Sequence, residues 1–123
     1  MQRFPFRPNQ RLHTPEQYDQ VFSGKHSAGD NVLLVFVDQS GPGPAQLGTS
    51  VGKCCGNSVK RHQWKRHIRE AFRLSQSQWI PGLRIVVVPR PGISASSIEI
   101  RKSFLTLVPR AMRKLTKKSG DSA

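Results

Sequence analysis

Basic residues crowd the stretch between Lys53 and Arg73, where Glu70 is the single acid. If this stretch is helical, it holds like-charge pairs four residues apart, each costing roughly 0.2–0.5 kcal/mol in an isolated helix. The pairs are Arg61/Lys65, Lys65/Arg69 and Arg69/Arg73. A helix selected only for solubility would alternate its charges, so the pattern favours neutralisation by a polyanion over a merely solvated face. Arginine suits phosphate, because its planar guanidinium can donate two parallel hydrogen bonds.

Catalysis by the chain itself would need acids, histidines or a nucleophile that converge. The acids are Glu16, Asp19, Asp30, Asp38, Glu70, Glu99 and Asp121, scattered over the chain. Glu16 and Asp19 share a helix face, but a favourable interaction with the helix N-terminus explains them better than two-metal chemistry. Ser58 has no base at a defined spacing. We therefore predict no catalytic residue in this chain.

A zinc site could be built only from Cys54, Cys55, His62 and His67. Adjacent cysteines rarely chelate one metal together, and structural sites space them as Cys-x₂₋₄-Cys. We expect no metal ligands and no cofactor bound by the protein alone.

A helix would position the cations. Gly56 lets the chain turn, and Asn57 or Ser58 can cap the helix by accepting a backbone N–H. The apolar side chains follow an i, i+4, i+7, i+8 pattern that predicts one buried stripe: Trp64, Ile68, Ala71 and Phe72. The basic side chains and His62 project on the neighbouring sector, with Arg61 between the two faces.

The whole chain is strongly basic. Its 123 residues predict a single domain, 1–123, and carry a net charge of +13 at pH 7. Such a charge indicates a polyanionic partner, nucleic acid before membrane, because no stretch reaches the roughly 20 apolar residues of a spanning helix. The N-terminus lacks the apolar run of a secretory signal. Together with cysteines that offer no framework disulfide, this predicts the cytoplasm.

The first half of the chain predicts an arm, a helix and strands. Residues 1–13 contain Pro5 and Pro8 and suit an extended arm. Thr14, Pro15 and Gln17 form a capping-box start for a helix with Tyr18, Val21 and Phe22 on one face, ending at Gly24. Residues 31–38 predict a strand, and residues 46–52 predict a second one antiparallel to it. Residues 26–30 are a weak candidate for another strand.

After the basic helix, the apolar run Leu83–Pro89 predicts a central strand buried on both faces. Ser94 to Ser97 offer caps for a last helix whose apolar side holds Ile100, Phe104, Leu107, Val108 and Met112. Pro109 should kink or divide that helix. Residues 114–123 suit a frayed tail.

Residues 51–73 read V-G-K-C-C-G-N-S-V-K-R-H-Q-W-K-R-H-I-R-E-A-F-R. This stretch resembles the signature of the protein subunit of bacterial ribonuclease P, and Arg11-Leu12, Tyr18 and Val21-Phe22 resemble that family's N-terminal pattern. His62, Gln63 and Cys54 depart from the signature. The resemblance implies an α+β domain of αβββαβα order with a mixed sheet. It also implies a left-handed βαβ crossover, against the right-handed rule that holds in about 98% of cases.

In this family a catalytic RNA, using Mg²⁺, removes the leader from the 5′ end of precursor tRNA, and the protein assists. The resemblance therefore implies two partners, the catalytic RNA and precursor tRNA, with no membrane and no DNA. Contacts with the catalytic RNA are expected at Lys53, Asn57, Lys60, Arg61, His62, Lys65, Arg66, Arg69 and Arg73. Candidates for binding the leader, in a cleft between the first helix, the sheet and the basic helix, are Tyr18, Phe22, Phe36 and Lys53.

Two alternatives stay open. The three aromatic residues could fill the core instead of stacking on nucleotides, and for Phe22 and Phe36 the core is favoured. The chain could also be a basic ribosomal or RNA-chaperone protein. A DNA reader is less favoured, because Gln63 alone offers base-edge recognition beside arginine.

Overall fold

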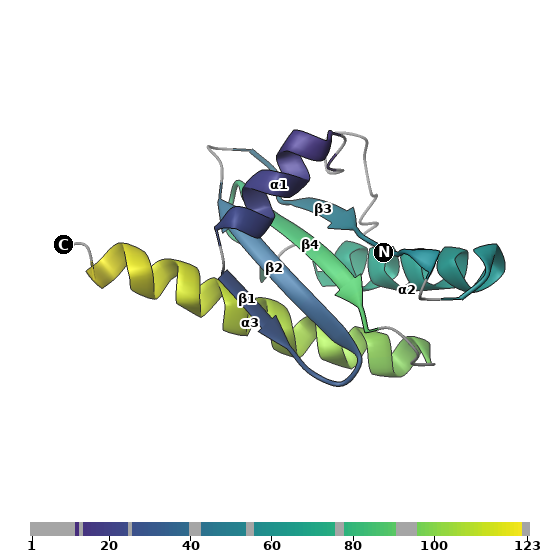
Figure 1. The fold of residues 1–123 in the computed structure, drawn as a ribbon. Helices are drawn as coiled ribbons and strands as arrows, with labels where there is room; N and C mark the ends of the chain where they lie inside the picture. The colour runs from purple at the N-terminus through teal and green to yellow at the C-terminus, as the bar shows by residue number, and fades with distance from the viewer. Residues whose placement is uncertain are drawn as a thin grey trace.

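The computed structural model describes residues 12, 14–24, 26–39, 43–53, 56–75, 78–90 and 96–121, with side chains to residue 115 in the last helix. The elements are α1 (Pro15–Ser23), β1 (His26–Gly29), β2 (Leu33–Gln39), β3 (Gln46–Thr49), α2 (Ser58–Ser75), β4 (Leu83–Pro89) and α3 (Ser97–Asp121). This order confirms the predicted α+β class, including the weakly indicated first strand. Helix α1 lies on one face of the sheet, and α3 crosses the other (Figure 1).

The sheet has the order β1-β2-β4-β3. Strand β4 pairs antiparallel with β2 and parallel with β3. Strand β3 therefore runs antiparallel to β2, as predicted, but the two strands are not neighbours. The central place belongs to β4 because its apolar run suits burial on both faces. The left-handed crossover from β3 through α2 to β4 stays an expectation from the resemblance.

The main core lies between the sheet and the two long helices. The predicted stripe of α2 is buried there, at Trp64, Ile68, Ala71 and Phe72, and it packs with the inward side chains of β2 and β4 and with α3. On the opposite face a smaller cluster joins Leu12, Val21 and Val86. Leu12 is the one described residue of the predicted arm, and its N–H donates to the Leu47 carbonyl at 3.1 Å.

The helices begin where the capping signals predict. In α1 the Thr14 hydroxyl accepts from the Gln17 N–H at 3.2 Å, and the Gln17 side chain accepts from the Thr14 N–H at 3.2 Å. In α2 the Asn57 side chain accepts from the Lys60 N–H at 3.0 Å. Gly56, just before it, has a φ of 112°, a conformation that favours glycine. Ser96 and Glu99 form the same reciprocal pair at the start of α3, at 3.2 and 3.1 Å.

The last helix is not divided at Pro109, although division was one of the two effects expected of that proline. Pro109 lies inside α3, which is one continuous element to Asp121. The residues around the proline, Leu107, Val108 and Ala111, are fully buried, and we attribute the continuity to this packing, which outweighs the loss of one backbone hydrogen bond. The helix also extends past residue 114, where the tail was expected to begin. Cys54, Cys55 and the predicted cap at Ser94 lie outside the described residues.

Candidate nucleic-acid interface

Helix α2 presents its cations away from the core. Lys60, His62 and Arg66 are exposed. The remaining basic side chains of the helix are partly exposed: Arg61, Lys65, Arg69 and Arg73. Lys53 and Asn57 are exposed just before the helix, and the Asn57 side-chain oxygen is engaged in capping. The buried stripe thus orients one side of α2 inward and leaves a basic surface outside.

Arg73 is paired with Glu70, the single acid of this stretch. Its guanidinium forms an ion pair with Glu70, one helical turn away, and Nε donates to Glu70 at 3.3 Å. The hydrogen bond from Arg73 holds the pKa of Glu70 below its usual value, with help from the charges of Arg101 and Arg66. The same hydrogen bond raises the pKa of Arg73. Arg73 is therefore less available to a phosphate than the other cations of the helix, because it already has an acid partner.

Sequence reasoning missed Arg101 as a member of this surface. It lies on α3 and is exposed, and its charge acts on Glu70 of α2. The basic surface therefore continues from α2 onto the adjoining part of α3. Nothing in the spacing of either helix alone could reveal this, because it depends on how the helices pack.

Arg61 lies between the two faces of α2, as the helical wheel predicts. It is partly buried, and its Nε atom is enclosed without a hydrogen-bond partner among the described residues. The side chain is therefore held against the protein along its stem. Such anchoring leaves fewer conformations for the terminal guanidinium than a fully exposed arginine has.

A second candidate surface lies on the sheet face covered by α1. Strand register places Phe36, Val86 and Gly48 in one row, because Val86 is the partner of both other residues. Val86 is fully buried beneath α1. Phe22 packs edge-on against Phe36, with ring centroids 4.8 Å apart and an interplanar angle of 83°. Tyr18, one turn earlier on α1, lies against Gly48.

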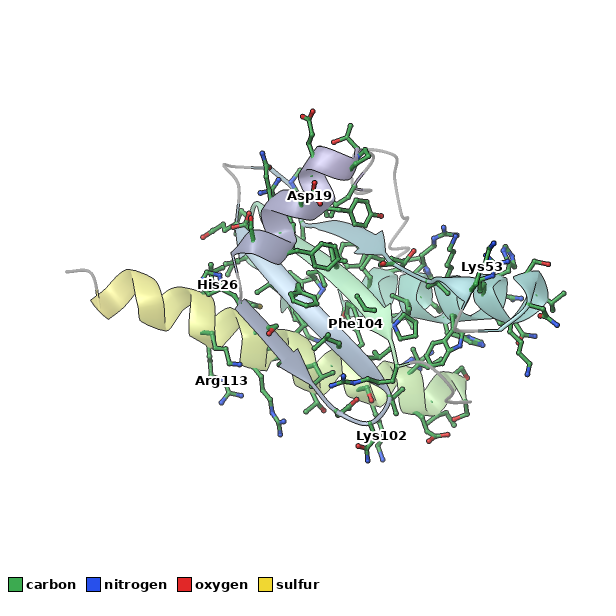
Figure 2. All side chains as sticks on the ribbon, in the orientation of Figure 1. Asp19, His26, Lys53, Lys102, Phe104 and Arg113 are labelled. Atoms are coloured by element: carbon green, nitrogen blue, oxygen red, sulfur yellow. The ribbon has the colours of Figure 1, made fainter. Side chains whose placement is uncertain are left out.

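We call Tyr18, Phe22 and Phe36 the aromatic surface. All three are partly buried against the smaller cluster, and none is fully enclosed. Beyond Phe36, Leu34 and Val88 form the next row and are also only partly buried. The three predicted aromatic residues therefore come together. Lys53 does not join them, since it lies beside α2, apart from α1, where Asp19 marks the helix (Figure 2).

A polar network centred on the buried Arg84, beside the aromatic surface, was not predicted. Arg84 on β4 forms an ion pair with Asp38 on β2, and its other terminal nitrogen donates to the Gln20 side chain of α1 at 2.8 Å. Arg84 is 7% exposed. The signal was present, since Arg84 is the one charged residue in the run Leu83–Pro89. The network ties α1 to the two central strands.

Among the described residues, no three acids, histidines or cysteines lie close enough to hold a metal ion. In the same part of the chain, no helix has the length and apolar character needed to cross a bilayer.

Comparisons with known proteins agree with one another. Residues 6–112 match the family model for ribonuclease P. The ribonuclease P protein component of Brevibacillus brevis is 38% identical over 103 residues, which span 82% of each chain. That of Saccharophagus degradans is 34% identical over 116 residues, 93% of this chain and 86% of the relative.

Solved structures show the same fold. The ribonuclease P protein of Staphylococcus aureus superimposes with a TM-score of 0.74 at 27% identity, covering 83% of this chain and 94% of its own. That of Thermotoga maritima gives 0.70 at 25% identity, covering 78% and 92%. The family match spans most of the sequence, and the relatives align over most of their length. The chain therefore belongs to the ribonuclease P protein family and is the protein component of a tRNA-processing endoribonuclease.

Proposed function

We propose that the two surfaces divide the work of the subunit. The basic surface of α2 binds phosphates of the catalytic RNA, and the aromatic surface binds the single-stranded leader of precursor tRNA. The RNA supplies catalysis with Mg²⁺, and the protein holds the substrate in place. The observation that carries this proposal is the separation of the surfaces, since the cations lie along α2 while the aromatic rings lie where α1 packs on the sheet.

The chemistry of each surface suits its proposed partner. Exposed arginines and lysines release counterions from a nucleic-acid backbone, which gives strong and salt-dependent binding. Aromatic rings stack on any base, so they tolerate the variable sequence of leaders and contribute roughly 1–3 kcal/mol per base. Tyr18, Phe22 and Phe36 are packed well enough to be held rigid, yet each keeps an exposed part.

We assign the contacts with the catalytic RNA to Lys60, His62, Lys65, Arg66 and Arg69 first, because these side chains form no ion pair among the described residues. Arg61 and Asn57 are the next candidates. Arg61 is partly buried against the protein, and the Asn57 side chain caps α2. Arg73 is the weakest candidate, because Glu70 already neutralises much of its charge. Lys53 is better suited to the RNA side than to the leader side, given its place beside α2 (Figure 2).

Crosslinking tests this division. Precursor tRNA carrying 4-thiouridine in its leader, bound to the reconstituted holoenzyme, should crosslink to peptides that contain Tyr18 or Phe36. The catalytic RNA carrying the same probe should crosslink to α2. Leader crosslinks confined to α2 would overturn the assignment. We also propose that the complex acts in the cytoplasm and that purified protein without RNA leaves precursor tRNA intact at any Mg²⁺ concentration.

A further inference from the structure

Gly48 lies inside strand β3, where glycine is unfavourable because it loses much backbone entropy and offers no side chain for packing. Its backbone conformation does not require glycine, since the described glycines with positive φ are Gly43, Gly56 and Gly82. Gly48 is nevertheless buried. The absence of a side chain at position 48 therefore leaves room for a neighbouring group and is not required by the backbone conformation.

The space is occupied by the ring of Tyr18. A Cβ atom at position 48 would lie 2.7 Å from Cε1, 2.8 Å from Cζ and 2.8 Å from the hydroxyl oxygen of Tyr18. These distances are far below the sum of the van der Waals radii, and the Cβ atom would meet two ring carbons and the hydroxyl oxygen of one rigid phenol group together. The phenol ring therefore lies directly on the backbone of β3. Only glycine at position 48 permits so short a distance between the ring and the strand.

The position of the Tyr18 ring matters because it lies over one end of the row Phe36, Val86 and Gly48. Gly48 and Phe36 flank Val86 in the sheet, and directly opposed residues share a face. Tyr18 covers the β3 end of the row, and Phe22 covers the β2 end through its contact with Phe36. If the Tyr18 ring moved away from the sheet, the relative positions of the three rings that face a nucleotide would change.

We propose that Gly48 is a positioning residue for leader recognition, acting through Tyr18 and touching no nucleotide itself. This inference rests on the proposed role of the aromatic surface. A methyl group at position 48 displaces the Tyr18 ring, so the leader meets it at the wrong height. Catalytic-RNA binding is expected to be unaffected, because it is assigned to α2 on another part of the domain.

A double-mutant cycle tests the inference, using Gly48→Ala, Tyr18→Ala and their combination in the reconstituted holoenzyme. The measured quantity is the ratio of affinities for precursor tRNA and for mature tRNA, which lacks the leader. Each single substitution should lower this ratio about fivefold or more, as expected when one base no longer stacks. In the Tyr18→Ala protein, Gly48→Ala should cause no further decrease, because the ring that it displaces is gone.

A loss of structure that does not arise from the Tyr18 ring would give a different result. It would weaken binding of the catalytic RNA and of both tRNAs together, and it would not disappear in the Tyr18→Ala background. If Gly48→Ala does not fold, the double variant should fold, since the collision is removed; its failure to fold would overturn the inference. If Tyr18→Ala lowers the ratio but folded Gly48→Ala leaves it unchanged, the inference about Gly48 is overturned, and the proposed role of the aromatic surface stands. An unchanged ratio in Tyr18→Ala would instead remove Tyr18 from the proposed leader site, on which the inference rests.

Discussion

Arg84 and Asp38 face each other across neighbouring strands and form an ion pair beneath α1. The side chain of Arg84 is 8% exposed and that of Asp38 is 24% exposed. Gln20 of α1 accepts a hydrogen bond from the same guanidinium. The pair therefore links the helix that carries Tyr18 and Phe22 to the two strands at the centre of the sheet.

Loss of the Asp38 carboxylate should destabilise the domain more than loss of the hydrogen bond between Arg84 and Gln20. Asp38→Asn leaves a buried positive charge with a weakened partner, and loss of one partner of a buried pair costs up to about 3–5 kcal/mol. Gln20→Ala removes a single hydrogen bond to a charged group, worth about 1.5–3 kcal/mol when buried and less here, because Gln20 is exposed. Urea unfolding measures both.

Arg84→Met supplies the control for this pair. Combined with Asp38→Asn, it should cost less than the sum of the two single substitutions, because neither residue is then left as an unpaired charge. Strict additivity of the two unfolding free energies would show that the ion pair contributes nothing.

Substitution of Arg66 and Arg69 by alanine should weaken binding of the catalytic RNA and lower the salt slope by about 1 for each phosphate that is no longer neutralised. The fold should survive, because both side chains lie off the buried stripe. Lys102→Ala with Arg110→Ala is a matched control, since it removes two exposed cations from α3. An equal fall in the slope for both double variants would mean that total charge, not α2, determines binding.

Acid should unfold the protein partly through Asp30. Burial raises the pKa of this carboxyl, but hydrogen bonds from the N–H groups of Leu33 and Val32 and from Ser103, with the charge of Arg90, outweigh it and lower the pKa. A lowered pKa stabilises the folded state above the unfolded pKa, which is about 3.9, and this stabilisation is lost as the pH falls through the folded pKa.

The Asp30→Asn protein should therefore lose less stability than the wild type between about pH 5 and the acid limit, as measured by thermal unfolding at a series of pH values. Some dependence of stability on pH should remain in Asp30→Asn, because the pKa of Glu70 is also lowered. Identical acid profiles for the two proteins would show that the Asp30 hydrogen bonds do not stabilise the fold.

Local features of the fold could be predicted from the sequence, because neighbouring residues determine them. The Thr14–Gln17 capping box and the buried stripe from Trp64 to Phe72 depend on spacings within a single helix. The gathering of Tyr18, Phe22 and Phe36 was expected only through resemblance to the family. Its physical basis is the register that brings Phe36 and Val86 together.

Long-range relations could not be predicted. Asp38 and Arg84 are separated by 46 residues, and their pairing depends on β4 inserting between β2 and β3. The contact of Tyr18 with Gly48 depends on the same insertion, because α1 crosses the sheet only once the strand order is set. The ion pair of Arg73 with Glu70 is local and could have been anticipated, since residues three apart share a helix face.

Tyr18 and Phe22 should respond differently to truncation, although they lie one turn apart on α1. Tyr18 lies at the β3 end of the aromatic surface, on the backbone of Gly48, whereas Phe22 interlocks with Phe36. A ring that stacks on a nucleotide contributes roughly 1–3 kcal/mol to binding, whereas truncation of a core phenylalanine costs about 3–5 kcal/mol of stability. Tyr18→Ala should therefore change the melting temperature little and weaken precursor tRNA selectively over mature tRNA. Phe22→Ala should lower the melting temperature more than it alters this preference.

Tyr18→Phe is the matched control, because it keeps the stacking ring and removes only the hydroxyl group; it should retain the preference for precursor tRNA. The measurements are thermal unfolding of each protein and equilibrium binding of both tRNAs to each reconstituted holoenzyme. If Tyr18→Ala unfolds the domain, or weakens precursor and mature tRNA equally, Tyr18 is a core residue, and the leader contact must lie nearer Phe36, where Leu34 and Val88 leave the sheet face partly exposed.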